Sequence, residues 1–335
     1  YILYKNLALP NQILAVTFTN KAANEMKSRV SNMINQSTEG WWVGTFHSIS
    51  AKIVRRHAEI VGLKNNFIII DQEDQTKLIK SICDAEKIDL KEKNAKFYTN
   101  SINRYKNQSL LVKDIFSQSL NNEEKKIAKI YSIYENELLR LNCCDFGNLL
   151  LHCINIFTKN KEVLKQYQWQ FKYIFVDEYQ DTNFAQQKML KLLYNGHKNL
   201  CCVGDDDQSI YSWRGADIKN ILTFEKTFNT STIFRLEQNY RSTKRILNCA
   251  SKLISNNRGR YKKELWSNNI LGDKIQIKGF WETKEEAASI SDHIELLISS
   301  KISLNNIAIL MRVAAHTRSL EERFLNIGMP YRIVG

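Results

Sequence analysis

Several short apolar runs in this chain end abruptly in polar residues. The clearest are Gln12 to Phe18, Phe171 to Val176 and Leu200 to Val203. Hydroxyl, amide or carboxylate side chains follow each run within two residues. A short apolar run bounded in this way is typical of a strand that is buried on both faces of a parallel sheet. The pattern therefore predicts a parallel sheet with polar residues at the carboxyl ends of its strands, where such sheets bind ligands.

Apolar residues at helical spacing follow two of the predicted strands. After the first strand, Thr19 or Asn20 is a suitable N-cap for a helix. A strand over Trp42 to Gly44 leads into Thr45-Phe46-His47-Ser48 and a helix that ends near His57. A strand, a polar turn and a helix in this order make half of a βαβ unit, which indicates an α/β fold.

The segment from Phe67 to about Arg140 has a different character. It is rich in Lys, Glu, Asn and Gln, and its apolar residues recur at helical spacing. We expect a mostly helical insertion outside the sheet, after which Asp145 returns the chain to the core. A helical pattern over Tyr1 to Leu9, which stops at Pro10, predicts a further helix at the start.

Beyond Asp217 the chain alternates between predicted helices and strands, and the elements from Ile275 to Leu325 predict a second α/β unit. The pattern indicates one helix from Asp217 to about Phe228 and another near Leu320 to Leu325. Two helices between them end at about Ser255 and at about Ile298. Strands are expected at Thr232 to Leu236, Ile275 to Phe280, Ile307 to Met311 and Tyr331 to Gly335. The intervening Asn256 to Asp273 is a basic, irregular loop.

Charge favours a polyanionic partner. The 335 residues include 48 Lys and Arg against 35 Asp and Glu, for a formal charge of +13. Such an excess is most often matched to nucleic acid. In the basic loop we expect a solvated group of cations, with contact to a DNA backbone as the alternative; they are Arg258, Arg260, Lys262 and Lys263.

Cysteine spacing and hydropathy exclude several other classes. The seven cysteines include no C-x-x-C pair, which argues against a zinc or redox site. No apolar run is long enough to span a bilayer, so no membrane partner is expected. Reduced, buried thiols suit a cytoplasmic protein, which is the location we expect.

Candidate chemistry lies at two strand ends. Asp177-Glu178 follows the run that ends at Val176, and carboxylate oxygens there suit a magnesium ion and an attacking water. At the next strand end Gln208 can reach a phosphate, and an aromatic, basic segment follows within the same loop. Its Trp213, flanked by small and basic residues, suits stacking on an unpaired base, with core packing as the alternative.

A series of motifs in this order resembles the UvrD/Rep-type superfamily 1 (1A) DNA helicases. The motifs are Thr17-Phe18-Thr19-Asn20-Lys21-Ala22-Ala23, Gly44-Thr45-Phe46-His47-Ser48, Val176-Asp177-Glu178-Tyr179-Gln180-Asp181-Thr182-Asn183, Val203-Gly204-Asp205-Asp206-Asp207-Gln208-Ser209-Ile210-Tyr211-Ser212-Trp213-Arg214-Gly215-Ala216 and Leu236-Glu237-Gln238-Asn239-Tyr240-Arg241-Ser242-Thr243. The resemblance covers essentially the whole chain. It implies a RecA-like parallel sheet domain with a helical insertion, plus part of a second RecA-like α/β domain.

The resemblance also implies domain boundaries. Residues 1–62 and 141–230 would form the first RecA-like ATPase domain, and residues 63–140 the helical insertion. Residues 231–335 would be the N-terminal part of the second RecA-like domain.

The same resemblance implies the cofactors ATP and Mg²⁺ and roles for site residues. Asp177 would bind the magnesium ion and Glu178 would activate water. Gln208 would sense the γ-phosphate, Tyr240 would stack on the adenine, and Arg241 would act as an arginine finger. The single-stranded DNA track would be lined by Phe18, Thr19, Asn20, Thr45, Phe46, His47, Tyr211, Trp213 and Arg214.

The chain departs from the family pattern in two respects. It contains no phosphate-cradling G-x-x-x-x-G-K-[ST], which in the family lies upstream of the position of Tyr1. The family's later segments would lie beyond Gly335, so we expect a chain truncated at both ends, with little ATPase activity by itself. After Arg312, Val313-Ala314 stand where the family commonly has Thr-Asn.

The resemblance implies an ATP-dependent 3′-5′ DNA helicase or translocase of repair or replication. Its partners would be single-stranded DNA and single/double-strand junctions. One alternative is the helicase part of a nuclease–helicase recombination subunit. The other is a remnant that binds single-stranded DNA without catalysis.

Overall fold

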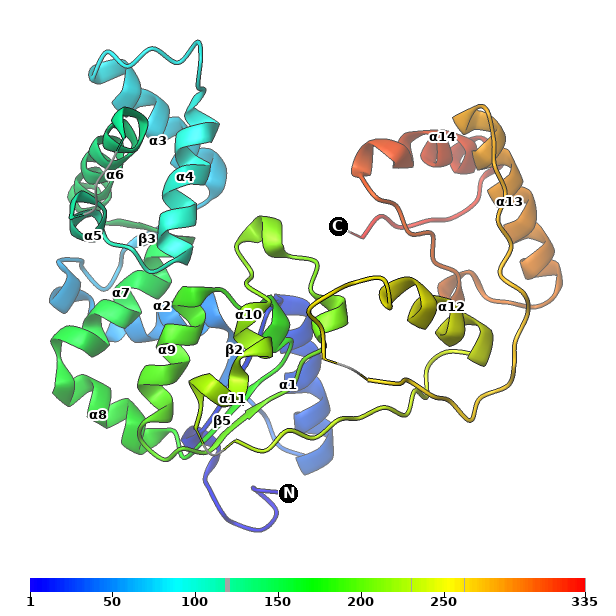
Figure 1. Ribbon diagram of the computed structural model, residues 1–335, viewed down its shortest axis with the longest axis horizontal. Helices are drawn as coiled ribbons and strands as arrows, with labels where there is room; N and C mark the ends of the chain where they lie inside the picture. The colour runs from blue at the N-terminus through cyan, green and yellow to red at the C-terminus, as the bar shows by residue number, and fades with distance from the viewer. Residues whose placement is uncertain (118–120, 230, 262, 335) are drawn as a thin grey trace. The chain divides into compact units, whose positions relative to one another are not determined.

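The computed structural model describes residues 1–117, 121–229, 231–261 and 263–334. The chain divides into two compact units. The first consists of residues 1–236 and 254–263, and the second of residues 237–253 and 264–335. Figure 1 shows the elements of both.

A parallel sheet forms the centre of the first unit, as predicted. Its strands are β1 (Ile13–Thr17), β2 (Trp42–Thr45), β5 (Tyr173–Val176) and β6 (Leu200–Cys202), in the order β2-β1-β5-β6. All three pairings are parallel. The prediction that β6 is buried on both faces is wrong, because this strand lies at an edge of the sheet and its central residue is exposed.

Hydroxyl caps begin the two helices that follow the first strands. In α1 (Asn20–Ile34) the Thr19 side chain accepts from the Ala22 backbone, and in α2 (Phe46–Arg56) Thr45 accepts from Ser48. The prediction of a helix over Tyr1 to Leu9 is wrong. This segment forms turns, because Asn6 takes a left-handed conformation (φ 53°) that interrupts a right-handed helix.

Helices α7 (Phe146–Lys159), α8 (Lys161–Gln170) and α9 (Phe184–Tyr194) complete the core around the sheet. Helix α2 packs closely on α7, and α7 packs on α9. Strand residues such as Leu14 and Val176 share one buried cluster with Ile53 of α2 and Phe157 of α7. This core holds the carboxyl ends of the strands in fixed positions.

The predicted helical insertion is confirmed. It contains α3 (Gln72–Ala85), α4 (Ala95–Asn107), α5 (Val112–Phe116) and α6 (Asn122–Arg140), grouped together in Figure 1. These helices enclose a core of their own, separate from the core around the sheet. A short parallel pair was not predicted: β3 (Ile68–Ile70) pairs with β4 (Cys143–Asp145) where the insertion begins and ends.

The predicted helix from Asp217 to Phe228 is two short helices. These are α10 (Lys219–Leu222) and α11 (Phe224–Thr227). Thr223 leaves the helical conformation between them, and its hydroxyl donates to the Lys219 carbonyl at 2.7 Å. Such a side-chain bond competes with the helix ladder, which explains the break.

In the part of the second unit that the structure describes, the regular structure is helical apart from an isolated bridge between Gln238 and Trp266. Helix α12 (Lys244–Ile254) runs to the boundary between the units, and α13 (Thr283–Ser299) packs on α14 (Thr317–Ile327) around a small core. The predictions of strands at 232–236, 275–280, 307–311 and 331–334 are wrong for the structure described; residue 335 lies outside the described residues. A strand needs a hydrogen-bonded neighbour, and side chains such as Ile277 and Leu310 stay 94% and 92% exposed.

Among the described residues, every helix is too short or too polar to cross a bilayer.

Candidate functional site

The loops after β1, β5 and β6 leave the sheet side by side. The Asp177 backbone N–H donates to the Val16 carbonyl of β1 at 2.9 Å. On the other side, the Val203 N–H donates to Val176 at 2.8 Å, and the Tyr179 N–H donates back to Val203 at 2.9 Å. The two acidic strand ends predicted from the sequence are therefore adjacent.

Gln180 joins these two strand ends through its buried side chain. Its Nε2 donates to Glu178 Oε2 at 2.7 Å, and its Oε1 accepts from the Asp205 backbone N–H at 2.9 Å. A Cβ atom at Gly204 would lie 2.7 Å from Gln180 Oε1, so glycine is needed for this close approach. The sequence placed Gln180 in a motif but gave it no role, because the bridge depends on the pairing of β5 with β6.

Glu178 stands in a left-handed backbone conformation, with φ 53° and ψ 46°. This conformation is unfavourable for a residue with a side chain, and such strain concentrates at functional sites. The side chain of Asp181 lies nearby. Burial, with a smaller contribution from the Glu178 charge, raises the pKa of Asp181 to about 6.

The donor set at the end of β1 and β5 fits a magnesium ion. Thr17 follows Val16, which pairs with Val176, so Thr17 and Asp177 lie at the same level of neighbouring strands. The Thr17 hydroxyl is buried and has no hydrogen-bond partner, and the same is true of Asp181 Oδ1. Hard cations prefer oxygen ligands of this kind.

A second acidic group is paired with cations of the chain. Carboxylate oxygens of Asp205, Asp206 and Asp207 lie within 4.8 Å of one another. Arg260 Nε donates to Asp207 Oδ1 at 2.7 Å, and Lys263 Nζ pairs with Asp205 and lies 3.1 Å from Asp207 Oδ2. Burial alone would raise the pKa of Asp207, but these two cations outweigh it and lower the pKa.

Two side chains of the basic loop are in a different environment from the one predicted. Arg260 and Lys263 are partly buried ion-pair partners, so the expectation of solvated side chains is wrong for both. Arg258 is exposed as expected. Lys262 lies outside the described residues.

Gln208 is exposed and held by the same acidic group. Its Nε2 donates to Asp205 Oδ2 at 2.7 Å. Asp205 therefore contacts Gln180 through its backbone, and Gln208 and Lys263 through its carboxylate. A hydrogen-bonded chain runs from Glu178 to the Gln208 amide.

An aromatic and basic arm, formed by Tyr211, Trp213 and Arg214, continues from this loop. The Tyr211 ring stacks on Phe18 from the loop after β1, with centroids 4.8 Å apart and a 33° interplanar angle. The Arg214 guanidinium lies 4.7 Å from the Trp213 ring and 5.5 Å from the Tyr211 ring. Trp213 is 73% exposed, so core packing is wrong for this residue and its ring is open to a ligand.

The remaining predicted DNA contacts of the first unit divide into two groups. Thr19 and Asn20 are exposed next to Phe18. Thr45 and Phe46 are buried, and the Phe46 ring belongs to the core, so the structure does not present either to a DNA strand. The reason is that Thr45 ends β2 and caps α2, whose first residue faces the sheet.

His47 lies at the edge of this region. Its ring packs edge-on against Phe146 with centroids 5.8 Å apart. Burial lowers the pKa of His47, and the Asp145 charge opposes that shift. The imidazole is therefore held mainly neutral near pH 7.

Tyr240 and Arg241 belong to the second unit. Tyr240 is 76% exposed, and its hydroxyl donates to Gln238 Oε1 at 2.7 Å. The Arg241 side chain is exposed, while its backbone N–H donates to Asn239 Oδ1. Both side chains are open to a ligand, and their roles with ATP stay predictions.

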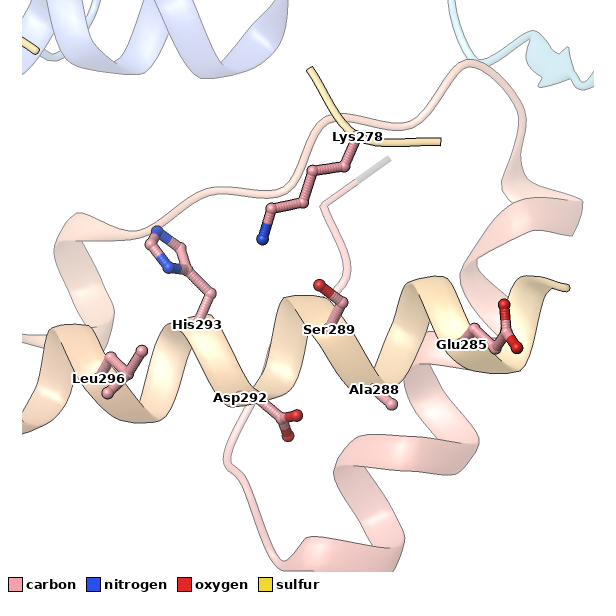
Figure 2. A pocket seen from close by; sticks show the side chains of 7 residues that line it. All are labelled: Lys278, Glu285, Ala288, Ser289, Asp292, His293 and Leu296. Atoms are coloured by element: carbon pink, nitrogen blue, oxygen red, sulfur yellow. The ribbon is translucent and has the colours of Figure 1, made fainter. Parts of the chain in front are cut away.

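A shallow pocket also lies along α13 in the second unit. Figure 2 shows Lys278 extending over the helix, with Ser289 and His293 on the helix itself. No residue that lines this pocket is a predicted site residue.

Comparison with known proteins identifies the chain. Residues 1–229 match the UvrD/REP helicase N-terminal domain, and residues 234–335 match the UvrD-like helicase C-terminal domain. The chain belongs to the UvrD/Rep helicase family. The predicted family, its RecA-like α/β fold and its class of enzyme, a DNA helicase and ATPase, are thereby confirmed at the level of the family.

Relatives in the helicase family match the chain over its whole length. It is 48% identical to a probable DNA helicase II homolog of Rickettsia felis and 49% identical to DNA helicase II of Rickettsia typhi, and it covers 51% of each. It is 43% identical to the ATP-dependent DNA helicase PcrA of Staphylococcus aureus, of which it covers 46%. The chain thus spans about half the length of these relatives.

Proposed function

We propose that this chain supplies the ATP- and DNA-responsive core of a 3′-5′ DNA helicase or translocase of repair or replication. One observation carries the proposal. The loop after β6 holds Gln208, which is linked to Glu178 through Asp205 and Gln180, and the exposed Trp213. A phosphate contact and a base contact would therefore share one short segment.

The proposed roles at the strand ends follow from the donor set. Asp177, with the Thr17 hydroxyl beside it, would hold Mg²⁺, which neutralises phosphate charge when bound. Glu178 would accept a proton from the attacking water, and its hydrogen bond from Gln180 fixes the direction of the carboxylate. From the second unit, Tyr240 would stack on the adenine and Arg241 would act on the transferring phosphate.

Gln208 offers a route from phosphate to DNA. In the structure its amide donates to Asp205. A γ-phosphate that accepts this hydrogen bond instead would pull Gln208 from Asp205 and shift the segment that leads to Tyr211. The stacked Phe18 and Tyr211 rings would then transmit the shift to the DNA track.

Four further expectations from the sequence remain predictions: the domain boundaries, the activity of the chain by itself, its location and its DNA partners. We propose residues 1–62 and 141–230 as the first RecA-like domain, 63–140 as the insertion and 231–335 as the start of the second RecA-like domain. Low ATPase activity of the chain by itself, cytoplasmic location and a preference for single/double-strand junctions also stay predictions.

Trp213→Ala should weaken binding of the 335-residue chain to an oligo(dT) by about tenfold, because base stacking contributes about 1–3 kcal/mol per base. Fluorescence anisotropy of labelled oligo(dT) at several salt concentrations measures the effect. The salt dependence should stay unchanged, since a tryptophan neutralises no phosphate.

Trp169→Ala is the matched control for this variant. Trp169 is another exposed tryptophan, on α8 and outside the strand-end loops. We expect its removal to leave the Kd unchanged. Equal affinities of the wild type and Trp213→Ala would contradict the proposed DNA track.

Two alternative functions make different predictions for the complete gene product. The helicase part of a nuclease–helicase subunit would require a nuclease domain in the complete gene product. A non-catalytic remnant is the other, and it would bind oligo(dT) while the complete gene product showed no ATP hydrolysis.

A further inference from the structure

The last residue of α4 contacts both functional loops of the first unit. Asn183 Nδ2, just beyond the Asp177–Thr182 strand-end loop, donates to Asn107 Oδ1 at 2.9 Å. In turn Asn107 Nδ2 donates to the Arg214 carbonyl at 3.2 Å. One amide side chain from the helical insertion thus bridges the acidic strand end and the aromatic arm.

The chemistry of an amide suits this position. Asn107 presents an acceptor to one loop and a donor to the other, which neither an aspartate nor an alanine can do. Gly215, the residue after Arg214, has a left-handed conformation (φ 93°), and a Cβ there would lie 2.5 Å from Asn107 Nδ2. The backbone of the arm is therefore packed closely against this amide.

The end of α4 is anchored, so Asn107 does not simply follow the loops. The preceding residue, Lys106, is fully buried, with Nζ 2.6 Å from Asp145 Oδ2 and 2.7 Å from Glu135 Oε1. Beyond Asn107, Lys188 Nζ donates to Ser109 Oγ at 3.2 Å. These contacts fix the segment to α6, β4 and α9.

We propose that Asn107 is a positioning residue that sets the place of the Tyr211–Trp213–Arg214 arm relative to the Asp177–Glu178 strand end. The insertion thereby takes part in DNA binding by the first unit without touching the DNA at this point. This inference rests on the proposed function, because it assigns the arm to DNA.

Two substitutions at Asn107 test the bridge in the 335-residue chain. Asn107→Ala removes both hydrogen bonds, and Asn107→Asp keeps the acceptor for Asn183 but turns an oxygen toward the Arg214 carbonyl. We expect each to raise the Kd for oligo(dT) about fivefold, in line with the loss of one or two hydrogen bonds. Asn100→Ala, on the same helix with an exposed side chain, is the control and should bind as the wild type does.

A double-variant cycle separates positioning from general stability. If Asn107 acts through the arm, Asn107→Ala should add little to the Kd of Trp213→Ala, because the base contact it positions is already lost. A purely structural role would give independent effects in the cycle, and that outcome overturns the inference. The melting temperature of each variant is measured alongside.

The failure of this inference is distinguishable from failure of the proposed function. If the wild-type chain binds oligo(dT) and Trp213→Ala binds it more weakly, but both Asn107 variants bind as the wild type, the inference alone is overturned. If the wild-type chain does not bind oligo(dT), the proposed function fails and the inference falls with it.

Discussion

Glu178→Gln in the complete gene product that carries this sequence should slow DNA-stimulated ATP hydrolysis by at least about a hundredfold, the usual contribution of a positioned general base. A glutamine has nearly the same shape as glutamate but does not accept the proton of an attacking water. Its amide oxygen can still accept from Gln180 Nε2, which donates to the Glu178 carboxylate at 2.7 Å. The change therefore removes the base and leaves the bridge between the strand ends.

Steady-state ATP hydrolysis with saturating oligo(dT) measures this effect. Binding of oligo(dT) should remain at the wild-type level, since the aromatic arm is untouched. Glu162→Gln is the control, because Glu162 is an exposed carboxylate in the first turn of α8. Hydrolysis by Glu178→Gln within a few-fold of the wild-type rate would contradict the role of this residue.

Lys106→Met should lower the free energy of unfolding by about 3–5 kcal/mol, the usual cost of removing one partner of a buried ion pair. Methionine fills a similar volume. It leaves Asp145 and Glu135 facing each other without the cation that lies 2.6 Å and 2.7 Å from their oxygens. Tyr134 and Gln75 also donate to Asp145, and they do not supply the missing charge.

The pKa shifts of Lys106 and Asp145 determine how this loss of unfolding free energy depends on pH. Burial alone would lower the pKa of Lys106, but Asp145 and Glu135 outweigh it and raise that pKa. Burial would raise the pKa of Asp145, and Lys106 outweighs it and lowers the pKa. The stabilisation from Asp145 is present above its unfolded pKa and is lost as pH falls through its folded pKa; that from Lys106 is lost only in strongly alkaline solution.

In Lys106→Met the two carboxylates repel, so their pKa values rise and protonation relieves the strain as pH falls. The destabilisation should therefore be smaller at pH 5 than at pH 7. Urea unfolding of the 335-residue chain at both pH values measures it. Lys129→Met is the control, since the Lys129 ion pair with Glu86 is largely exposed and should contribute less than about 1 kcal/mol. A loss under 1 kcal/mol for Lys106→Met would be incompatible with the buried ion pair.

The sheet and its strand-end residues were predictable because their signals are local. Apolar runs at Gln12–Phe18 and Phe171–Val176 must be buried, and each ends where polar residues begin. Parallel pairing then brings Asp177 beside the loop after β1, a consequence of topology and not of residue spacing. The N-caps Thr19 and Thr45 are local as well.

The pattern of apolar and polar residues does not predict contacts between residues that are far apart in the sequence. A lysine in a helix is expected to be solvated. Lys106 is buried instead, because the chain brings Asp145, 39 residues later, beside it. Lys263 pairs with Asp205 across 58 positions for the same reason. Phe46 shares a motif with His47, and which of the two is buried depends on how α2 meets the sheet. In the second unit, apolar runs predicted strands, but a strand also requires a partner, which periodicity does not supply.

The proposed link between the phosphate site and the aromatic arm runs through Gln208. It is tested by ATP hydrolysis of the complete gene product, with and without oligo(dT), in the wild type and in Gln208→Ala. We expect DNA to accelerate hydrolysis by the wild type strongly, and Gln208→Ala to lose most of this acceleration while still binding oligo(dT). Under the proposed function Gln208 would link a bound phosphate to Asp205 and the arm, so the variant should keep the DNA contacts and lose the link. An unchanged ratio of stimulated to unstimulated rate in Gln208→Ala would contradict the account.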